Sequence, residues 1–207
     1  MPETNPYSRL EAFCDGVFAI ALTLLIIDIK IPSTAEINNT ADFWHALKHI
    51  APSIFAFVLS FTIILITWVN HHNALKLGKR SSALFIYANG LLLLGVVFMP
   101  FPTSLLGEYI LTDHAAPAVI LYEVTMALQA LGWALITHAA LKDHLGKSEK
   151  ANLQIRKNGQ YAFIAFGIYT FCGIIAIWFP LTIAIVTTLI WIFWLIHGIN
   201  IKNEEVT

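Results

Sequence analysis

The chain has 207 residues, of which 57% are hydrophobic and 12% are charged, and its formal net charge is −1 at pH 7. Soluble domains average about 45–50% apolar and about 25% charged residues, so this composition excludes an ordinary soluble domain. We expect one integral membrane domain over residues 1–207 and no binding of nucleic acid.

Six apolar stretches predict an all-α integral membrane protein with six transmembrane helices. Each stretch is near the length of about 20 residues that crosses the hydrocarbon core of a bilayer. Pro32 and Pro180 mark breaks between them, and Pro100 bends the end of the third. The expected helices cover residues 10–31, 43–73, 83–106, 115–141, 159–178 and 181–201. The second is expected to begin along the outer interface, with Asp42 as its cap.

The basic residues predict the orientation of these helices. If the N-terminus is cytoplasmic, all of the 12 Lys and Arg residues except Lys30 and Lys48 fall on the inner side. So strong an asymmetry predicts that both termini are cytoplasmic and that the chain is a multi-pass protein of the cell membrane.

The first apolar stretch carries ionisable side chains at both of its ends. Arg9 and Asp15 lie near the inner end, and Asp28 lies at the outer end. Ionisable groups at membrane depth are costly, so these residues are functional candidates. Asp28 also has a simpler interpretation, as a helix-end carboxylate in solvent or paired with Lys30.

An apolar stripe runs between these ends. On a helix, Ile20, Leu24 and Ile27 lie within about 60° of one another, and Thr23 and Asp28 flank them on either side. Ordinary packing is the commoner explanation of such a stripe, because every buried helix has one. A pore wall is the functional alternative.

A polar cluster is predicted where the second helix reaches the inner membrane boundary. A carboxylate at this depth must be paired, and donors from the second helix are available to Asp15. The candidate members of this inner network are Arg9, Cys14, Asp15, Trp68, Asn70, His71 and His72. The alternative is an interfacial tryptophan followed by solvated histidines.

The run from Arg9 to Leu25 resembles the signature of the transmembrane protein 175 family of potassium channels, whose first helix begins Arg-x-x-x-Phe-Ser-Asp. Trp68 and the histidine pair after it match the partner positions at the end of the family's second helix. One departure is Cys14, which stands where the family has Ser and is a weaker hydrogen-bond donor. The length and the six-helix pattern also fit a bacterial member with a single unit.

The resemblance implies a potassium channel that is a homotetramer in the lipid bilayer, with a pore lined by the first helix of each copy. By position, Ile20 would form the innermost ring of a hydrophobic constriction, with Leu24 and Ile27 above it and Thr23 beside them. The chain has no Thr-Val-Gly-Tyr-Gly filter, so selectivity is expected from constriction size and dehydration. Asp28 could concentrate cations at the outer mouth.

Other functions remain open from the residues alone. A proton-coupled secondary transporter could use Asp15 and Glu123 as titrating groups, although no pair of broken helices marks a substrate site. His138 and His197 could ligate a metal or haem, but they lie near helix ends and no metal-site spacing recurs. Neither a nucleophile–base constellation nor a cofactor motif is evident, so we expect no enzymatic activity, no cofactor and no resident metal.

Overall fold

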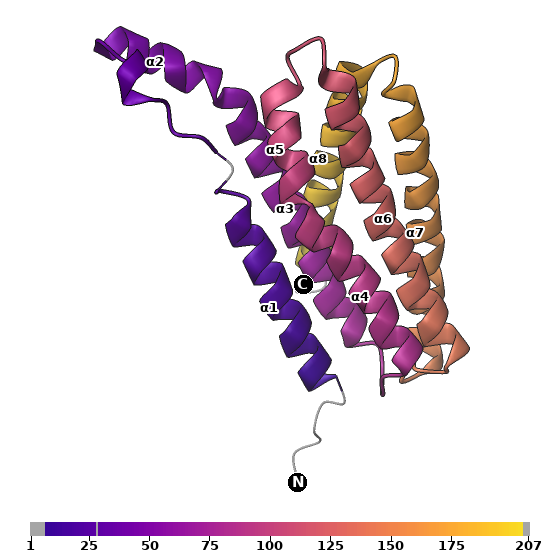
Figure 1. Ribbon diagram of the computed structural model, residues 1–207. Coiled ribbons are helices and arrows are strands. Elements are labelled where there is room, and N and C mark those ends of the chain that lie inside the picture. Colours follow the sequence, from indigo (N-terminus) through magenta and orange to yellow (C-terminus); the bar gives the residue numbers. More distant parts are fainter. Residues whose placement is uncertain (1–6, 28, 205–207) are drawn as a thin grey trace.

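The computed structural model describes residues 7–27 and 29–204, and within them the chain is built from helices. The elements are α1 (Ser8–Leu24), the 3-10 helix η1 (Thr34–Glu36), α2 (Thr40–His49), α3 (Ala51–Leu75), α4 (Ala83–Phe98), α5 (Pro100–Tyr109), α6 (Ala115–Lys142), α7 (Glu149–Ile175) and α8 (Pro180–Glu204). Figure 1 shows α3 to α8 as a bundle, with α1 along one edge and α2 extending away from it. The expectation of an all-helical protein is confirmed for the described residues.

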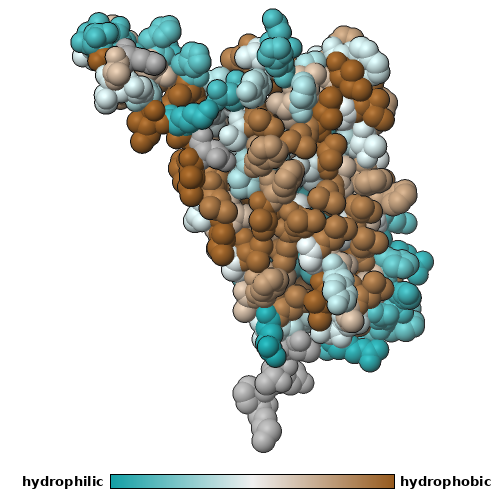
Figure 2. Space-filling view, viewed as in Figure 1, coloured by the Kyte–Doolittle hydropathy of each residue, from teal (hydrophilic) through white to brown (hydrophobic). Residues whose placement is uncertain are grey.

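Three helical segments among the described residues are long and apolar enough to cross a membrane. They are α3, the continuous pair α4–α5 over Ala83–Tyr109, and α6. The number of six spans therefore stays a prediction, as does the cytoplasmic position of the termini. Figure 2 shows apolar surface over the middle of the molecule and polar surface toward its two ends, as a membrane-embedded bundle requires.

Two helix starts differ from the predicted ones because of capping. Asn39, rather than Asp42, caps α2: its side chain accepts from the Asp42 backbone N–H at 3.0 Å. Asp42 in turn accepts from the Asn38 N–H, also at 3.0 Å. Helix α7 begins at Glu149 rather than near 159, because Ser148 accepts from the Ala151 N–H and so starts the helix in a charged stretch.

The breaks inside the expected second and third helices lie where prolines remove a backbone donor. The second helix is divided at Ile50 into α2 and α3, and Pro52 lies in the first turn of α3. The third is divided at Met99 into α4 and α5, and α5 begins at Pro100. Proline is tolerated in a first turn because its missing N–H would have no partner there.

Helix α6 is the centre of the bundle and is in contact with α4, α5, α7 and α8. Its buried side chains include Tyr122 and Met126, which belong to the main apolar core. Interhelical hydrogen bonds supplement this packing: Ser60 on α3 lies 3.0 Å from the Tyr122 hydroxyl and accepts from Thr103 on α5 at 2.6 Å. Such contacts between small polar side chains stabilise helix pairs in membranes.

Two loops at the α3–α4 and α6–α7 connections are joined by a short antiparallel bridge between Gly78 and Gly146. The Lys79 N–H donates to Leu145 at 2.8 Å, and the Lys147 N–H donates to Leu77 at 2.9 Å. These loops lie at the end of the bundle where α1 begins (Figure 1). We call this pair of loops the loop bridge.

Helices α4 and α6 cross so closely that a glycine is required between them. A Cβ atom on Gly132 would lie 2.8 Å from the backbone N and Cα of Leu92, which is closer than real contacts allow. We predict that Gly132→Ala lowers the free energy of unfolding by about 1–3 kcal/mol, because α4 must move away. Thermal unfolding in detergent measures this effect.

The matched control is Gly90→Ala in α4, where nothing lies within 4 Å of the added Cβ. This change should be neutral or slightly stabilising, since alanine favours a helix over glycine. Equal effects of the two substitutions would contradict the close crossing.

Candidate functional site

Helix α1 has one buried face and one exposed face. The buried face packs against α3 and α4. Its members are Cys14, Phe18, Ala21 and, just after the helix, Leu25. The predicted constriction residues lie elsewhere: Ile20 is 58% exposed, Leu24 38% and Ile27 71%. A single copy of the chain therefore does not use this apolar stripe for its own core.

Helix α1 ends at Leu24, seven residues before the predicted end at Ile31. The Ile27 N–H donates to the Leu24 carbonyl and the Ile29 N–H to Ile26, both at 3.2 Å, in tight turns. The early end of α1 follows from the β-branched residues that precede Pro32. Such side chains have a low preference for the α-helix, and a proline also disfavours the helical conformation of the residue before it. Asp28, the predicted outer carboxylate, lies outside the described residues.

Thr23 lies on the exposed face of α1, beside the apolar stripe. Its hydroxyl donates to the Ile20 carbonyl at 2.8 Å. A hydroxyl has one hydrogen and two lone pairs, so this bond uses the donor and leaves acceptor capacity on the oxygen.

In the N-terminal half of α1, two carboxyl groups meet side chains of α3. The expected hydrogen bond between Trp68 and Asp15 is present, with Nε1 donating to Oδ1 at 2.8 Å. His72 stacks on the Trp68 ring and places its Nδ1 3.0 Å from Oε1 of Glu11. Since Glu11 and Asp15 are four residues apart, they share one face of the helix, and α3 contacts both.

His71 has a different partner from the one expected. It is buried, and its Nε2 lies 2.7 Å from Oδ1 of Asn89 on α4. Asn89 donates its amide to the Phe85 carbonyl at 2.7 Å, which fixes Oδ1 as the acceptor and Nε2–H of His71 as the donor. The His71 ring also packs against Phe18 of α1, with 5.5 Å between ring centroids.

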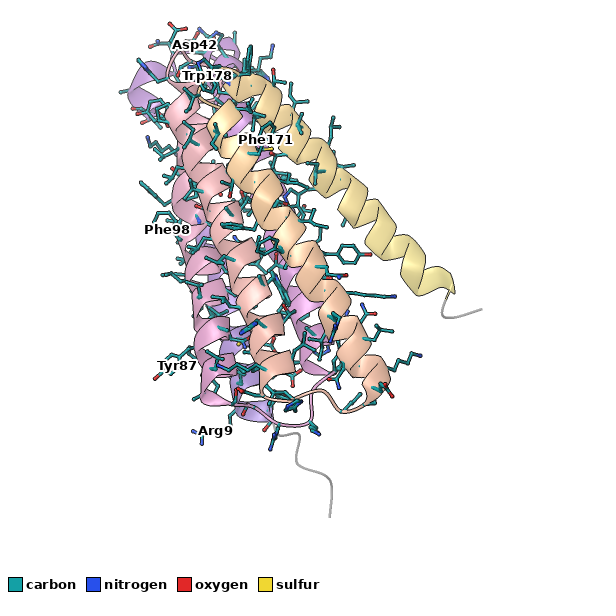
Figure 3. All side chains as sticks on the ribbon, turned by 90° about the vertical axis from the view of Figure 1, so that its right-hand side faces the viewer. Arg9, Asp42, Tyr87, Phe98, Phe171 and Trp178 are labelled. Atoms are coloured by element: carbon teal, nitrogen blue, oxygen red, sulfur yellow. The ribbon has the colours of Figure 1, made fainter. Side chains whose placement is uncertain are left out.

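Three further members of the predicted inner network do not join it within one chain. Arg9 and Asn70 are exposed, and the part of the chain that the structure describes offers neither a hydrogen bond nor an ion pair to them. Arg9 lies at the very end of the bundle in Figure 3. Cys14 is fully buried in the apolar core instead of bonding in the polar cluster. Arg9 and Asp15 are six residues apart, so their side chains point in different directions from the helix, which explains why the two do not meet.

Sequence reasoning missed Glu11, Asn89 and Tyr7. Glu11 could have been found from its spacing to Asp15, and Asn89 as a lone polar residue in an apolar helix. Tyr7 is buried before α1, where its hydroxyl donates to the Arg80 carbonyl and its ring packs against Phe85. Burial raises the pKa of the Tyr7 phenol, so the hydroxyl remains a donor at neutral pH.

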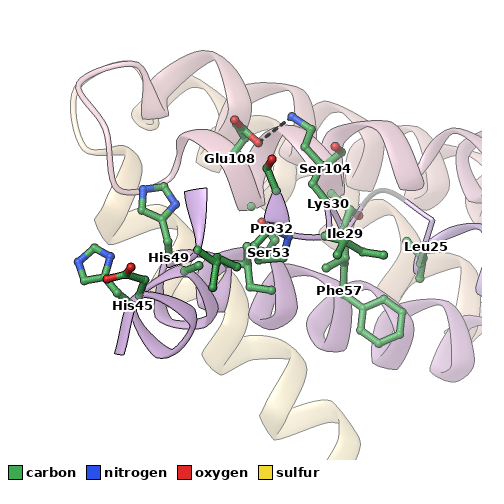
Figure 4. A pocket seen from close by; sticks show the side chains of 18 residues that line it. Leu25, Ile29, Lys30, Pro32, His45, His49, Ser53, Phe57, Ser104 and Glu108 are labelled. Atoms are coloured by element: carbon green, nitrogen blue, oxygen red, sulfur yellow. Dashed lines mark hydrogen bonds and ion pairs between the residues drawn. The ribbon is translucent and has the colours of Figure 1, made fainter. Parts of the chain in front are cut away.

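A pocket of about 520 Å³ lies at the opposite end of α1, between the connection that follows this helix, α2, α3 and α5. Figure 4 shows His45 and His49 of α2 on one side and the ion pair of Lys30 with Glu108 on the other. The Lys30 Nζ lies 3.2 Å from Glu108 Oε2, so Lys30 pairs with α5. Both side chains are largely exposed, and such pairs contribute at most about 1 kcal/mol.

Comparison with known proteins relates the chain to a family of ion channels. The family model of the endosomal/lysosomal potassium channel TMEM175 matches residues 9–100. A potassium channel of Chamaesiphon minutus is 44% identical over 145 residues, which cover 70% of this chain and 71% of that protein. A potassium channel of Chryseobacterium is 31% identical over 203 residues, covering 95% and 96% of the two chains.

A solved structure supports the same relationship. The crystal structure of a lysosomal potassium-selective channel TMEM175 homolog from Chamaesiphon minutus superposes with a TM-score of 0.67 at 35% identity. The match covers 91% of this chain and 99% of that chain. Residues 9–100 contain all of α1 except Ser8 and the α3 side chains that contact it, so the contacts of Asp15 with Trp68 and of Glu11 with His72 lie within the family match.

The hydrogen bond between Trp68 and Asp15 gives a testable expectation. Asp15→Ala leaves the indole N–H without its acceptor, which we expect to cost about 1–3 kcal/mol of stability. Asp15→Asn keeps an oxygen in place and should cost less. Thermal unfolding of the two variants in detergent measures the difference. If Asp15→Ala were as stable as the original chain, the carboxyl group would not contribute to holding α1.

Proposed function

The chain belongs to the TMEM175 family, and from this premise we propose that it forms a potassium-permeable channel in the bacterial cell membrane. The observation that supports this most is the exposed apolar face of α1. A helix that projects Ile20 and Leu24 away from its own bundle has an apolar surface available to other copies of the chain. The family's named relatives in bacteria are potassium channels.

The proposed pore is enclosed by α1 from each copy. One helix cannot surround an aqueous path, so several copies must be arranged around an axis, and cyclic symmetry is the usual arrangement. We propose a homotetramer, in keeping with the family resemblance. The position of α1 at the edge of the bundle favours this arrangement, because no other helix covers that side in Figure 1.

The proposed constriction consists of rings of Ile20, Leu24 and Ile27. Rings of this kind obstruct ions by excluding water, and they discriminate between cations weakly. Thr23 would add oxygen acceptors to the pore wall, since its hydroxyl hydrogen is already donated to Ile20. Asp28 would add negative charge at the outer mouth and so raise the local concentration of potassium.

The inner cluster would hold the pore helix in place. Asp15 accepts from Trp68, and Glu11 lies against His72, so both contacts join α1 to α3. This arrangement favours a structural role for Asp15 over the proton-carrying role of a transporter, because the carboxyl group is already engaged with a fixed donor.

The constriction can be tested by making it polar. We predict that Ile20→Asn increases the single-channel conductance in planar bilayers, since a polar ring retains water where an apolar ring expels it. The matched control is Ile164→Asn in α7, because Ile164 is 57% exposed against 58% for Ile20 but lies on the far side of the bundle. Equal conductance changes in the two variants would contradict the pore assignment.

The assembly can be tested by crosslinking. In a chain with Cys14 and Cys172 replaced by Ala, we predict that Leu24→Cys joins neighbouring copies in native membranes, giving species up to four chains. Phe171→Cys is the control, since Phe171 is 64% exposed and α7 lies on the side of the bundle away from α1 (Figure 1). Monomers alone at position 24 would exclude a pore lined by α1.

A further inference from the structure

A second acidic side chain lies inside the bundle, away from the pore helix. Glu123 is 1% exposed and belongs to α6, which is among the helices apolar enough to cross a membrane. Its helix packs against α7 and α8 rather than α1. Glu123 therefore has no place in the proposed pore, and its role needs a separate explanation.

Three helices meet at Glu123. Thr187 of α8 donates its hydroxyl to Oε1 at 2.6 Å, and Thr187 is itself buried. On α7, Gly173 packs beside Glu123, since a Cβ there would be in ordinary van der Waals contact with the Glu123 Cβ, at 3.5 Å. The second carboxyl oxygen, Oε2, is buried and has no hydrogen-bond partner within the described residues.

The groups around Glu123 are neutral. The titratable side chains that face it are Tyr122 on α6, and Tyr169 and Cys172 on α7. On α8 it faces Thr187, and over the described chain neither of the ion pairs involves Glu123. A carboxylate with one hydroxyl donor and no counter-charge is very costly in an apolar interior, whereas the protonated acid is not.

We propose that Glu123 is a proton-binding site at the junction of α6, α7 and α8, and that it holds its proton while α8 is docked. The protonated acid fits the observed contact, because its carbonyl oxygen accepts from Thr187. Proton release creates a charge that the junction cannot stabilise with the contacts it has. The site stands independently of the proposed channel function, since it lies outside the pore.

Trp191 is a second buried polar group on the same side of α8. It follows Thr187 by four residues, so the two side chains share a face of the helix. Its indole N–H is buried and, within the described residues, has no acceptor. The hydrogen bond from α8 to Glu123 is therefore that of the Thr187 hydroxyl.

Infrared spectroscopy of the full-length protein in detergent tests the protonation state directly. The original chain at neutral pH should show a carbonyl stretch from a protonated carboxyl group, and Glu123→Gln should lack that band. The control is Glu108→Gln, which removes an exposed glutamate and should reduce only the ionised carboxylate band. If Glu123→Gln instead removed intensity from the carboxylate band, Glu123 would be ionised, whether alone or with a bound cation, and the proposal would be overturned.

Two further measurements keep the proposal testable if Glu123→Gln folds poorly. Thr187→Val removes the hydroxyl donor and should shift the carbonyl band to higher frequency without abolishing it; an unchanged band would overturn the assignment.

The second measurement is the unfolding temperature as a function of pH. The folded chain binds a proton that the unfolded chain releases more easily, so the contribution of Glu123 to stability is fully present below the ordinary glutamate pKa of about 4.3 and should be lost as the pH rises from there through the pKa of Glu123 in the folded chain. Glu123→Gln should lack that part of the pH dependence, and parallel profiles would contradict the proposal.

Discussion

Helix α1 is attached to the bundle along one face, and the arrangement of the candidate site depends on this attachment. The buried face includes two small side chains, Cys14 and Ala21, which allow the helix to approach α3 and α4 closely. Phe18 extends further and reaches the ring of His71. With contacts on that side satisfied, the opposite face stays apolar and open. Exposing an apolar face to lipid costs little free energy, so this face of α1 is available for contacts between copies of the chain.

Asp15 and Glu123 are two acidic side chains that the helices accommodate in different ways. Asp15 lies in the N-terminal half of α1, is half-buried, and accepts a hydrogen bond from the Trp68 indole. Glu123 lies between three apolar helices, where one hydroxyl is its partner. The first environment favours a permanent structural contact and the second favours a neutral acid. Burial and the number of donors, rather than residue type, separate their roles.

The sequence predicted the helical class and most of the helix positions, because long apolar runs and prolines are strong signals. The predictions were wrong where the structure depends on local backbone preferences or on the packing of distant residues. The predicted end of α1 at Ile31 is too late, because a run of Ile residues has the apolar pattern of a membrane helix although β-branched side chains favour a helix only weakly and Pro32 disfavours it in the residue before. The partners of His71 and Lys30 could not be predicted, because Asn89 and Glu108 lie far along the chain and meet them only through helix packing.

The loop bridge and Tyr7 hold the N-terminal end of α1. Tyr7 is buried against the loops, and a Cβ on Gly78 would overlap its ring, so the fit is close. At the other end Leu25, just after the last helical residue, is 1% exposed and belongs to the main apolar core. A helix anchored at both ends acts as a strut, so Ile20 and Leu24 between the anchors keep a fixed direction relative to α3 and α4.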